Sequence, residues 1–222
     1  GCYPTSVLLP LIPLIKKKSI NSQNIIIDSK SGYSGAGRGV HKKFKDKNLY
    51  ESLSAYGVGF HRHNSEIDQE LKKYSKSGYC GDGRGVHKKY AKKNLYSSLS
   101  VYGVGFHRHN SEIEQELKNV TKKKFNFTFT PHLTPMFRGI LSTIYITVKK
   151  NVTQKRLLSE LNNFYKNKKF IKIQKIDKAL STNDIINTNN CFISVCKTKY
   201  KNKYIILSAI DNLIKGGAGQ AI

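Results

Sequence analysis

The chain is poor in the residues that mark several classes of protein. It has no Trp, one Met and five Pro in 222 residues. Its four Cys stand at positions 2, 80, 191 and 196, and they form neither a Cys-x-x-Cys pair nor a zinc-ligand spacing. Nothing here indicates a disulfide framework or a metal site, so we expect a reducing, cytoplasmic compartment. We interpret Cys191 and Cys196, which flank an apolar run, as buried core thiols.

Acidic residues are also scarce, with 14 Asp and Glu against 39 Lys and Arg and a formal net charge of +25. An excess of this size can indicate a nucleic-acid or anionic-surface binder. However, Lys is scattered through every segment, without an Arg-rich arm or a zinc-finger, homeodomain or RNP pattern. We interpret the charge as a compositional bias that could help to attract a phosphorylated substrate. We expect no nucleic-acid partner, and keep a basic nucleic-acid-binding protein as the alternative of another class.

Long hydrophobic runs are missing as well. Residues 6–15 are apolar, but this segment is too short to span a bilayer and contains Pro10 and Pro13. It lacks the features of a signal peptide, so we expect no membrane association. A helix should begin at Cys2 and be bent or broken after Leu9, because proline removes a donor and clashes with the preceding turn. Since the first residue is Gly rather than Met, we expect further sequence upstream.

The remaining pattern alternates predicted strands and helices. Strands are predicted at 24–28, 125–130, 138–148, 170–173, 191–196 and 204–207. Pro131 and Pro135 should end the second of these and enclose His132. Residues 153–166 place Leu157, Leu161 and Tyr165 on one helix face. We therefore predict an α+β domain over residues 1–222, with a mixed β-sheet and helices packed on one side.

The least ordinary feature is an internal repeat. Residues 31–76 recur as residues 77–122, with about three quarters of the positions identical. Two copies are too few for a solenoid, which needs at least about three repeats. We interpret the pair as a tandem duplication within one domain, in which one copy packs in place and the other is extruded.

Each copy begins with a glycine-rich loop that could bind an anion. In copy one, Ser34 and Gly35 precede Gly37-Arg38-Gly39, where glycines can turn backbone N–H groups toward a phosphate and Arg38 adds a charged fork. Copy two has Cys80 in place of Ser34 and Asp82 in place of Ala36. Because an Asp in this loop would repel phosphate, we favour copy one as the functional copy.

Two further groups of residues are candidates for nucleophilic chemistry. Cys2 stands before Pro4 at the expected start of a helix, where the positive end of the dipole favours a reactive thiolate. Each repeat copy ends in His-Arg-His, with the pairs His61/His63 and His107/His109. If this segment is extended, both rings of a pair point to the same face. Taken alone, Cys2 could equally be a small buried residue and the histidines an exposed polar loop.

Five motifs in this order resemble the N-acetyl-gamma-glutamyl-phosphate reductases, NADP-dependent semialdehyde dehydrogenases of arginine biosynthesis. They are Gly-Cys-Tyr-Pro-Thr at 1–5, the loop at 31–38, the segment 56–67, the segments 129–136 and 138–140, and Asp-Asn-Leu-Ile-Lys-Gly-Gly-Ala-Gly-Gln-Ala at 211–221. The resemblance implies the C-terminal domain fold of the glyceraldehyde-3-phosphate and semialdehyde dehydrogenase superfamily. It also implies a homo-oligomer, a dimer or a tetramer.

The resemblance implies roles for particular residues. Cys2 would attack the acyl phosphate of N-acetyl-glutamyl 5-phosphate, and NADPH would reduce the resulting thioester to the semialdehyde. The second histidine of a pair, His63 or His109, would be the acid/base. Substrate contacts would come from the first histidine of a pair and from the loops, and cofactor contacts from the last motif. The implied substrate residues are Ser34, Gly35, Arg38, His61, His107 and Arg138; the implied cofactor residues are Lys215, Gly216, Gly219 and Gln220.

The chain also departs from the family pattern. It contains no strand–GxGxxG–helix unit, so the nucleotide-binding Rossmann domain is absent from it and we expect no activity from this chain alone. A related alternative is a paralogue that acts on an aminoadipyl phosphate in lysine biosynthesis, which would differ only in substrate contacts.

Overall fold

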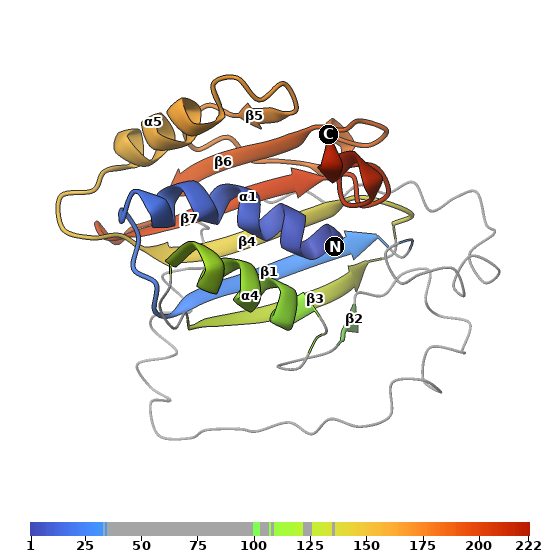
Figure 1. Ribbon diagram of the computed structural model, residues 1–222, viewed down its shortest axis with the longest axis horizontal. Helices are drawn as coiled ribbons and strands as arrows, with labels where there is room; N and C mark the ends of the chain where they lie inside the picture. The colour runs from blue at the N-terminus through green and yellow to red at the C-terminus, as the bar shows by residue number, and fades with distance from the viewer. Residues whose placement is uncertain (33, 35–99, 103–106, 108, 122–125, 135) are drawn as a thin grey trace.

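The computed structural model describes residues 1–32, 34, 100–102, 107, 109–121, 126–134 and 136–222. Within them, one mixed sheet carries helices on one of its faces (Figure 1). The helices are α1 (Cys2–Lys16), α4 (His109–Thr121) and α5 (Gln154–Tyr165). The strands are β1 (Ile25–Gly32), β2 (Ser100–Val101), β3 (Phe127–Thr134), β4 (Ile140–Thr147), β5 (Ile171–Ile173), β6 (Cys191–Lys197) and β7 (Lys203–Ile210). Two 3-10 turns, η4 (Thr182–Asp184) and η5 (Ala218–Ala221), complete the described elements.

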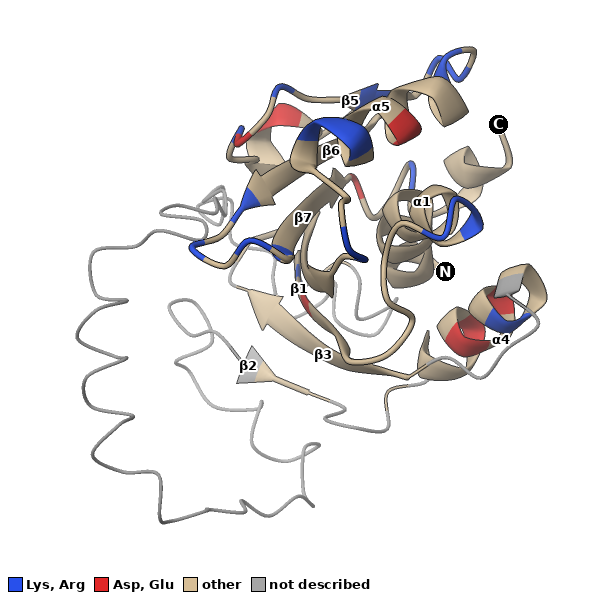
Figure 2. Ribbon diagram, turned by 90° about the vertical axis from the view of Figure 1, so that its left-hand side faces the viewer, with Lys and Arg blue, Asp and Glu red and all other residues tan. Residues whose placement is uncertain are grey.

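The seven strands follow the order β2-β3-β1-β4-β7-β6-β5. Strand β1 is parallel to β3 and antiparallel to β4, while β5 is parallel to β6. Figure 2 shows α1 and α4 together on one side of the strands. The predicted α+β fold, a mixed sheet with helices on one side, is therefore confirmed.

The apolar core lies between this sheet and the helices. Every second residue of β4, β6 and β7 faces the helices, as the strand period requires, and the centre of α1 is fully buried against them. Both thiols that were expected to be buried are so: Cys191, 0% exposed, lies in this core, and Cys196, 1% exposed, lies in a smaller cluster on the other face of the sheet. This smaller cluster, around Leu141, Leu207 and Ile185, is covered by the loop that precedes β6.

Strand β3 runs through Pro131, so the expectation that this proline ends the strand is wrong. Pro131 pairs with Ser29 of β1 in the parallel register, while its carbonyl accepts a bond from Tyr102 N at 3.2 Å on the other side. The N and O of one strand residue point to the same side, so the missing N–H faces the β2 side. Strand β2 is only two residues long there, and the proline removes no bond from the β1 ladder.

Helix α1 is continuous from Cys2 to Lys16, so of the two expected outcomes, a bend or a break after Leu9, the break is wrong. Pro13 cannot donate to the carbonyl of Leu9, four residues earlier, and that carbonyl would be left without its helical partner. The hydroxyl of Tyr165 on α5 donates to it instead, at 2.6 Å. A tertiary hydrogen bond thus replaces the missing helical one at this turn.

The replacement can be tested by a double-mutant cycle. Tyr165→Phe should lower the free energy of unfolding by about 1–2 kcal/mol, because the Leu9 carbonyl loses its partner. In a Pro13→Ala background this loss should be clearly smaller, since the introduced alanine has an N–H that can donate the helical bond. Urea unfolding followed by circular dichroism measures both values.

Pro10→Ala is the matched control, because its new N–H would reach Ser6 rather than Leu9. The Tyr165→Phe loss should therefore remain full in that background. Equal losses in the Pro13→Ala and Pro10→Ala backgrounds would contradict the replacement.

Both repeat copies contribute to the described fold. Copy one supplies the end of β1 and Ser34, whereas copy two supplies β2, Tyr102, His107 and α4. Most of both copies, including residues 35–99, lies outside the described residues. The strand–loop–helix unit that reaches the sheet therefore begins in copy one and ends in copy two.

This arrangement predicts that one repeat length can be removed. Deleting residues 54–99 joins Leu53 to Ser100, which recreates the native Leu99–Ser100 junction and keeps every described residue. The connection from Ser34 to β2 becomes shorter, which should raise the free energy of unfolding by about 1 kcal/mol through loop-closure entropy. Thermal and urea unfolding measure the effect.

Deleting residues 77–122 removes the same number of residues but replaces α4 by its copy-one counterpart, and serves as the comparison. If the chain without residues 54–99 is less stable than the full chain, the second copy contributes to the fold and the prediction is wrong.

Candidate active site

The site is built around the first turn of α1. Cys2 is the first residue of the helix and is half-buried. The Gly1 carbonyl accepts bonds from Thr5 N at 3.0 Å and Thr5 Oγ1 at 2.9 Å, and Pro4 stands where no helical donor is needed. A Cβ on Gly216 would lie 2.5 Å from Cys2 Cβ. Only glycine at 216 therefore leaves room for Cys2 against this segment.

The second histidine of copy two lies next to this turn. Helices α1 and α4 lie side by side (Figure 1), and His109 is the first residue of α4 with 6% exposure. Its Nε2 is 2.7 Å from the position that a Cβ on Gly1 would occupy, and its ring centroid is 5.6 Å from that of Tyr3. The start of α4 thus brings His109 beside the residues that flank Cys2.

Histidines 107 and 109 are close, but not for the reason expected. Because His109 already belongs to α4, the pair does not lie in an extended segment. The two ring centroids are 4.9 Å apart with an interplanar angle of 48°. The histidine pair that the structure describes beside α1 is that of copy two, while the preference for copy one, which rests on its glycine-rich loop, stays a prediction. His61 and His63 lie outside the described residues.

Tyr3 is a buried, hydrogen-bonded residue of the site. It is 2% exposed, its hydroxyl donates to the His132 carbonyl at 3.3 Å and it accepts a bond from the Tyr102 hydroxyl at 3.0 Å. Burial raises the pKa of Tyr3 well above its ordinary value, and the neighbouring Tyr102 adds to the rise. The phenol therefore stays protonated and acts as a fixed link between α1, β3 and the segment before α4.

Ser34 and Arg138 lie on a second side, around the turn that follows β7. Ser34 is buried, and its Oγ accepts a bond from Asn212 Nδ2 at 2.9 Å. Asn212 Oδ1 in turn accepts from Gly139 N at 2.7 Å. Asn212 thus links Ser34 of the glycine-rich loop to Gly139, the residue that precedes β4. Gly35 and Arg38 lie outside the described residues.

The guanidinium of Arg138 is held within the chain. Its Nη2 is 2.7 Å from Asp211 Oδ2, and its Nη1 donates to Asn187 Oδ1 at 2.7 Å. Asp211 is fully buried and also accepts bonds from the backbone N–H groups of Asn187, Leu213 and Ile214. The orientation of Arg138 is therefore set by a buried carboxylate.

The four expected cofactor residues form a packed turn. Lys215 is 5% exposed, and its amino group donates to the Gly219 carbonyl at 3.2 Å and lies 5.5 Å from the Phe170 ring centroid. Burial lowers the pKa of Lys215. A Cβ on Gly219 would collide with Asn189, and the side chain of Gln220 contacts Thr5 Oγ1. These contacts tie residues 215–220 to α1 and to the loop before β6.

Asp211 and Asn212 are the site residues to which no role was assigned from the sequence. Their signal was present, because both belong to the motif at 211–221. Only the contacts to Arg138 and Ser34 show what they do.

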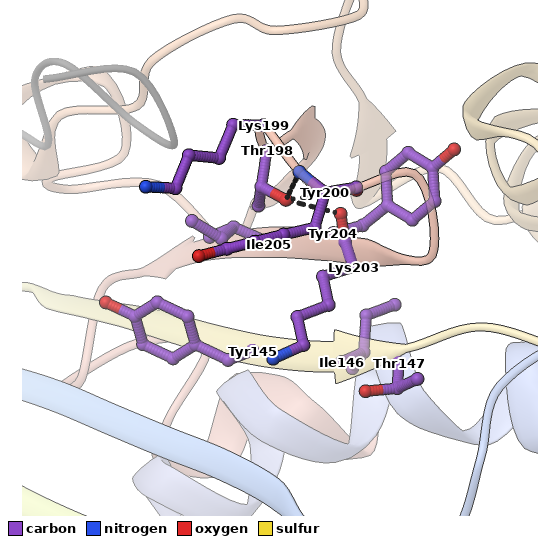
Figure 3. A pocket seen from close by; sticks show the side chains of 9 residues that line it. All are labelled: Tyr145, Ile146, Thr147, Thr198, Lys199, Tyr200, Lys203, Tyr204 and Ile205. Atoms are coloured by element: carbon purple, nitrogen blue, oxygen red, sulfur yellow. Dashed lines mark hydrogen bonds between the residues drawn. The ribbon is translucent and has the colours of Figure 1, made fainter. Parts of the chain in front are cut away.

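A separate shallow hollow of about 260 Å³ lies at the β6–β7 hairpin and β4 (Figure 3). The amino groups of Lys199 and Lys203 are each 5.3 Å from the Tyr200 ring centroid there. Its remaining lining residues are Tyr145, Ile146, Thr147, Thr198, Tyr204 and Ile205. None of the residues around Cys2 lines it, so the hollow is not part of the candidate active site.

Two other kinds of feature are missing from the described part of the chain. No described group of three or more His, Cys, Asp or Glu is placed to hold a metal ion. No described helix has the length and apolar character needed to cross a membrane.

Comparison with known proteins defines the class to which this fold and site belong. The model of the semialdehyde dehydrogenase dimerisation domain matches residues 2–76 and 73–212, and the chain belongs to this family. Two solved structures share the fold at low sequence identity. Aspartate semialdehyde dehydrogenase II from Vibrio cholerae has a TM-score of 0.63 at 12% identity over 100% of this chain and 58% of that one. Aspartate semialdehyde dehydrogenase from Francisella tularensis has a TM-score of 0.64 at 13% identity over 98% and 60%.

The names of curated relatives are more specific than the description of this family. The N-acetyl-gamma-glutamyl-phosphate reductase of Desulforamulus reducens is 37% identical over 100% of this chain and 51% of its own length. The probable chloroplastic N-acetyl-gamma-glutamyl-phosphate reductase of Arabidopsis thaliana is 36% identical over 100% and 44%. The chain thus spans about half the length of the curated relatives that it matches. The resemblance inferred from the five motifs is confirmed.

The geometry predicts which thiol reacts first. Burial raises the pKa of Cys191 to about 12 and also raises that of Cys196, so both stay protonated at neutral pH. Cys2 is half-buried in the first turn of α1, where the helix dipole favours a thiolate. Iodoacetamide at pH 7, followed by peptide mapping, should label Cys2 before Cys191 and Cys196. Earlier labelling of either buried thiol would contradict the assignment of Cys2.

Proposed function

We propose that this chain is the catalytic and dimerisation part of an N-acetyl-gamma-glutamyl-phosphate reductase, an NADP-dependent oxidoreductase of arginine biosynthesis. The observation that carries the proposal is the meeting of two helix starts, with Cys2 at the start of α1 and His109 at the start of α4. A thiol beside an imidazole is the arrangement that acyl transfer to cysteine requires. The names of the curated relatives supply the substrate.

In the first step Cys2 Sγ attacks the acyl carbon of N-acetyl-glutamyl 5-phosphate. The bond from this carbon to the phosphate oxygen breaks, phosphate leaves, and a thioester forms on Cys2. His109 takes the thiol proton before the attack and acts as the general base. The Glu112 carboxylate, with Oε1 3.9 Å from His109 Nε2, stabilises the imidazolium that results.

Ser34 and Arg138 are proposed for the substrate phosphate side. Because Ser34 Oγ accepts the bond from Asn212, its own proton is the one directed to a phosphate oxygen. The charge of Arg138 is partly balanced by Asp211, so Arg138 would hold the turn in place as well as attract an anion. Gly35 and Arg38 remain predicted loop contacts.

The residues assigned to NADP do not form a phosphate cradle. Lys215 is turned into the chain, and Gly216 and Gly219 are closed by Cys2 and Asn189. The hydride that a reductase needs would come from NADPH when it is bound. Only Gln220 of the four is exposed, next to α1.

The rival functions have less support. The names of the curated relatives favour the N-acetyl-glutamyl substrate over an aminoadipyl phosphate. Lys and Arg are spread over α1, α4, α5 and β5 among the described residues (Figure 2). This spread does not favour a nucleic-acid-binding face.

We also propose that the chain associates with a second copy of itself, as the description of the matched domain indicates. The sheet face opposite the helices fits this role. On it Ile26 of β1 and Tyr145 of β4 are cross-strand partners and are 50% and 41% exposed. Pairing of this face with a copy would cover both side chains.

Acyl transfer can be tested without a cofactor by using acetyl phosphate as the acyl donor. The 222-residue chain should release phosphate and gain an acetyl group that hydroxylamine removes, and peptide mapping should place it on Cys2. Cys2→Ser should abolish the adduct, and His109→Asn should slow its formation by at least about 100-fold, as expected for loss of a general base. An adduct that persists in Cys2→Ser would refute the proposal.

A further inference from the structure

The side chain and carbonyl of His107 make the two bonds of a helix N-cap. Its Nδ1 accepts a hydrogen bond from His109 N at 3.3 Å, and its carbonyl accepts one from Asn110 N at 2.8 Å. A capping residue satisfies the first N–H groups of a helix in this way. His107 therefore caps α4 at the turn that carries His109.

This bond fixes the state of the His107 ring. A backbone N–H can only donate, so Nδ1 must be the unprotonated nitrogen and the ring proton resides on Nε2. Protonation of Nδ1 would place two hydrogens against each other and break the cap. His107 is thus held as one neutral tautomer.

The ring is also clamped on several sides. It lies edge-on to Tyr3 of α1, Tyr102 and Phe129 of β3, with centroid distances of 5.7, 5.1 and 5.6 Å. The cap is therefore attached to the helix that carries Cys2 and to the sheet beneath it. Through His107, the start of α4 is set relative to the start of α1.

We propose that His107 is a positioning residue that holds His109 beside Cys2, rather than the substrate contact that the family resemblance implies for it. The inference rests on the proposed role of His109 as general base for Cys2. In this role the Nδ1 acceptor holds the backbone of His109, and the ring packs against the neighbouring aromatic side chains.

Two substitutions separate these parts. His107→Asn keeps an acceptor, since Asn Oδ1 is attached to Cγ as His Nδ1 is, but loses the ring. His107→Phe keeps a ring of similar shape and loses the acceptor. The two variants should differ in the behaviour of Cys2: His107→Asn loses the ring packing but preserves the behaviour of Cys2, whereas His107→Phe keeps the packing and alters Cys2.

The experiment measures the rate constant for alkylation of Cys2 by iodoacetamide against pH, in the full 222-residue chain with Cys80→Ser throughout. His107→Asn should share the pH profile of the parent, whereas the rate constant of His107→Phe at pH 7 should fall about five-fold toward that of His109→Asn, the loss expected from removal of a helix cap. Amide hydrogen exchange in the first turn of α4 should be faster in His107→Phe only.

The outcomes distinguish the inference from the function on which it rests. If His109→Asn changes the profile but His107→Asn changes it equally, or His107→Phe leaves both profile and exchange unchanged, the positioning role is overturned. If His109→Asn itself leaves the profile unchanged, the pairing of His109 with Cys2 fails, and the proposed mechanism fails with it.

Discussion

The burial of α1 against the sheet is the interaction on which the rest of the structure depends. Val7, Leu11 and Leu14 are fully buried, and the helix contacts α4, α5, β4 and β7. A helix in this position needs its backbone groups satisfied from outside wherever proline interrupts the ladder, and Tyr165 does so at Leu9. Because α1 is fixed along its length, its first turn, with Cys2, has a fixed place relative to the sheet.

The turn after β7 joins the two sides of the candidate site. Asn212 holds Ser34, Asp211 holds Arg138, and Gly216 lies against Cys2. A change in this turn would move Cys2, Ser34 and Arg138 together. The segment therefore acts as a common support, built on buried hydrogen bonds whose loss would leave polar groups without partners.

The internal repeat indicates how little the sheet constrains the chain that connects its strands. Loop-closure entropy grows only slowly with length, so a repeat-length insertion between β1 and β2 costs little free energy. The sheet does require that each register position of its strands is filled by one residue. Copy one fills these positions up to Gly32, and copy two fills them from Ser100 onward.

The α+β class, the positions of most strands, the burial of Cys191 and Cys196, and the family could all be predicted from the sequence, because strand and helix periodicity and short motifs are read directly from it. It failed at Pro13 and Pro131, where a partner from another element or a sheet edge removes the cost of the proline. The place of the histidine pair of copy two beside α1 could be seen only in three dimensions. The two His-Arg-His segments are identical in sequence, so their local signals cannot say which of them packs against α1 and β3.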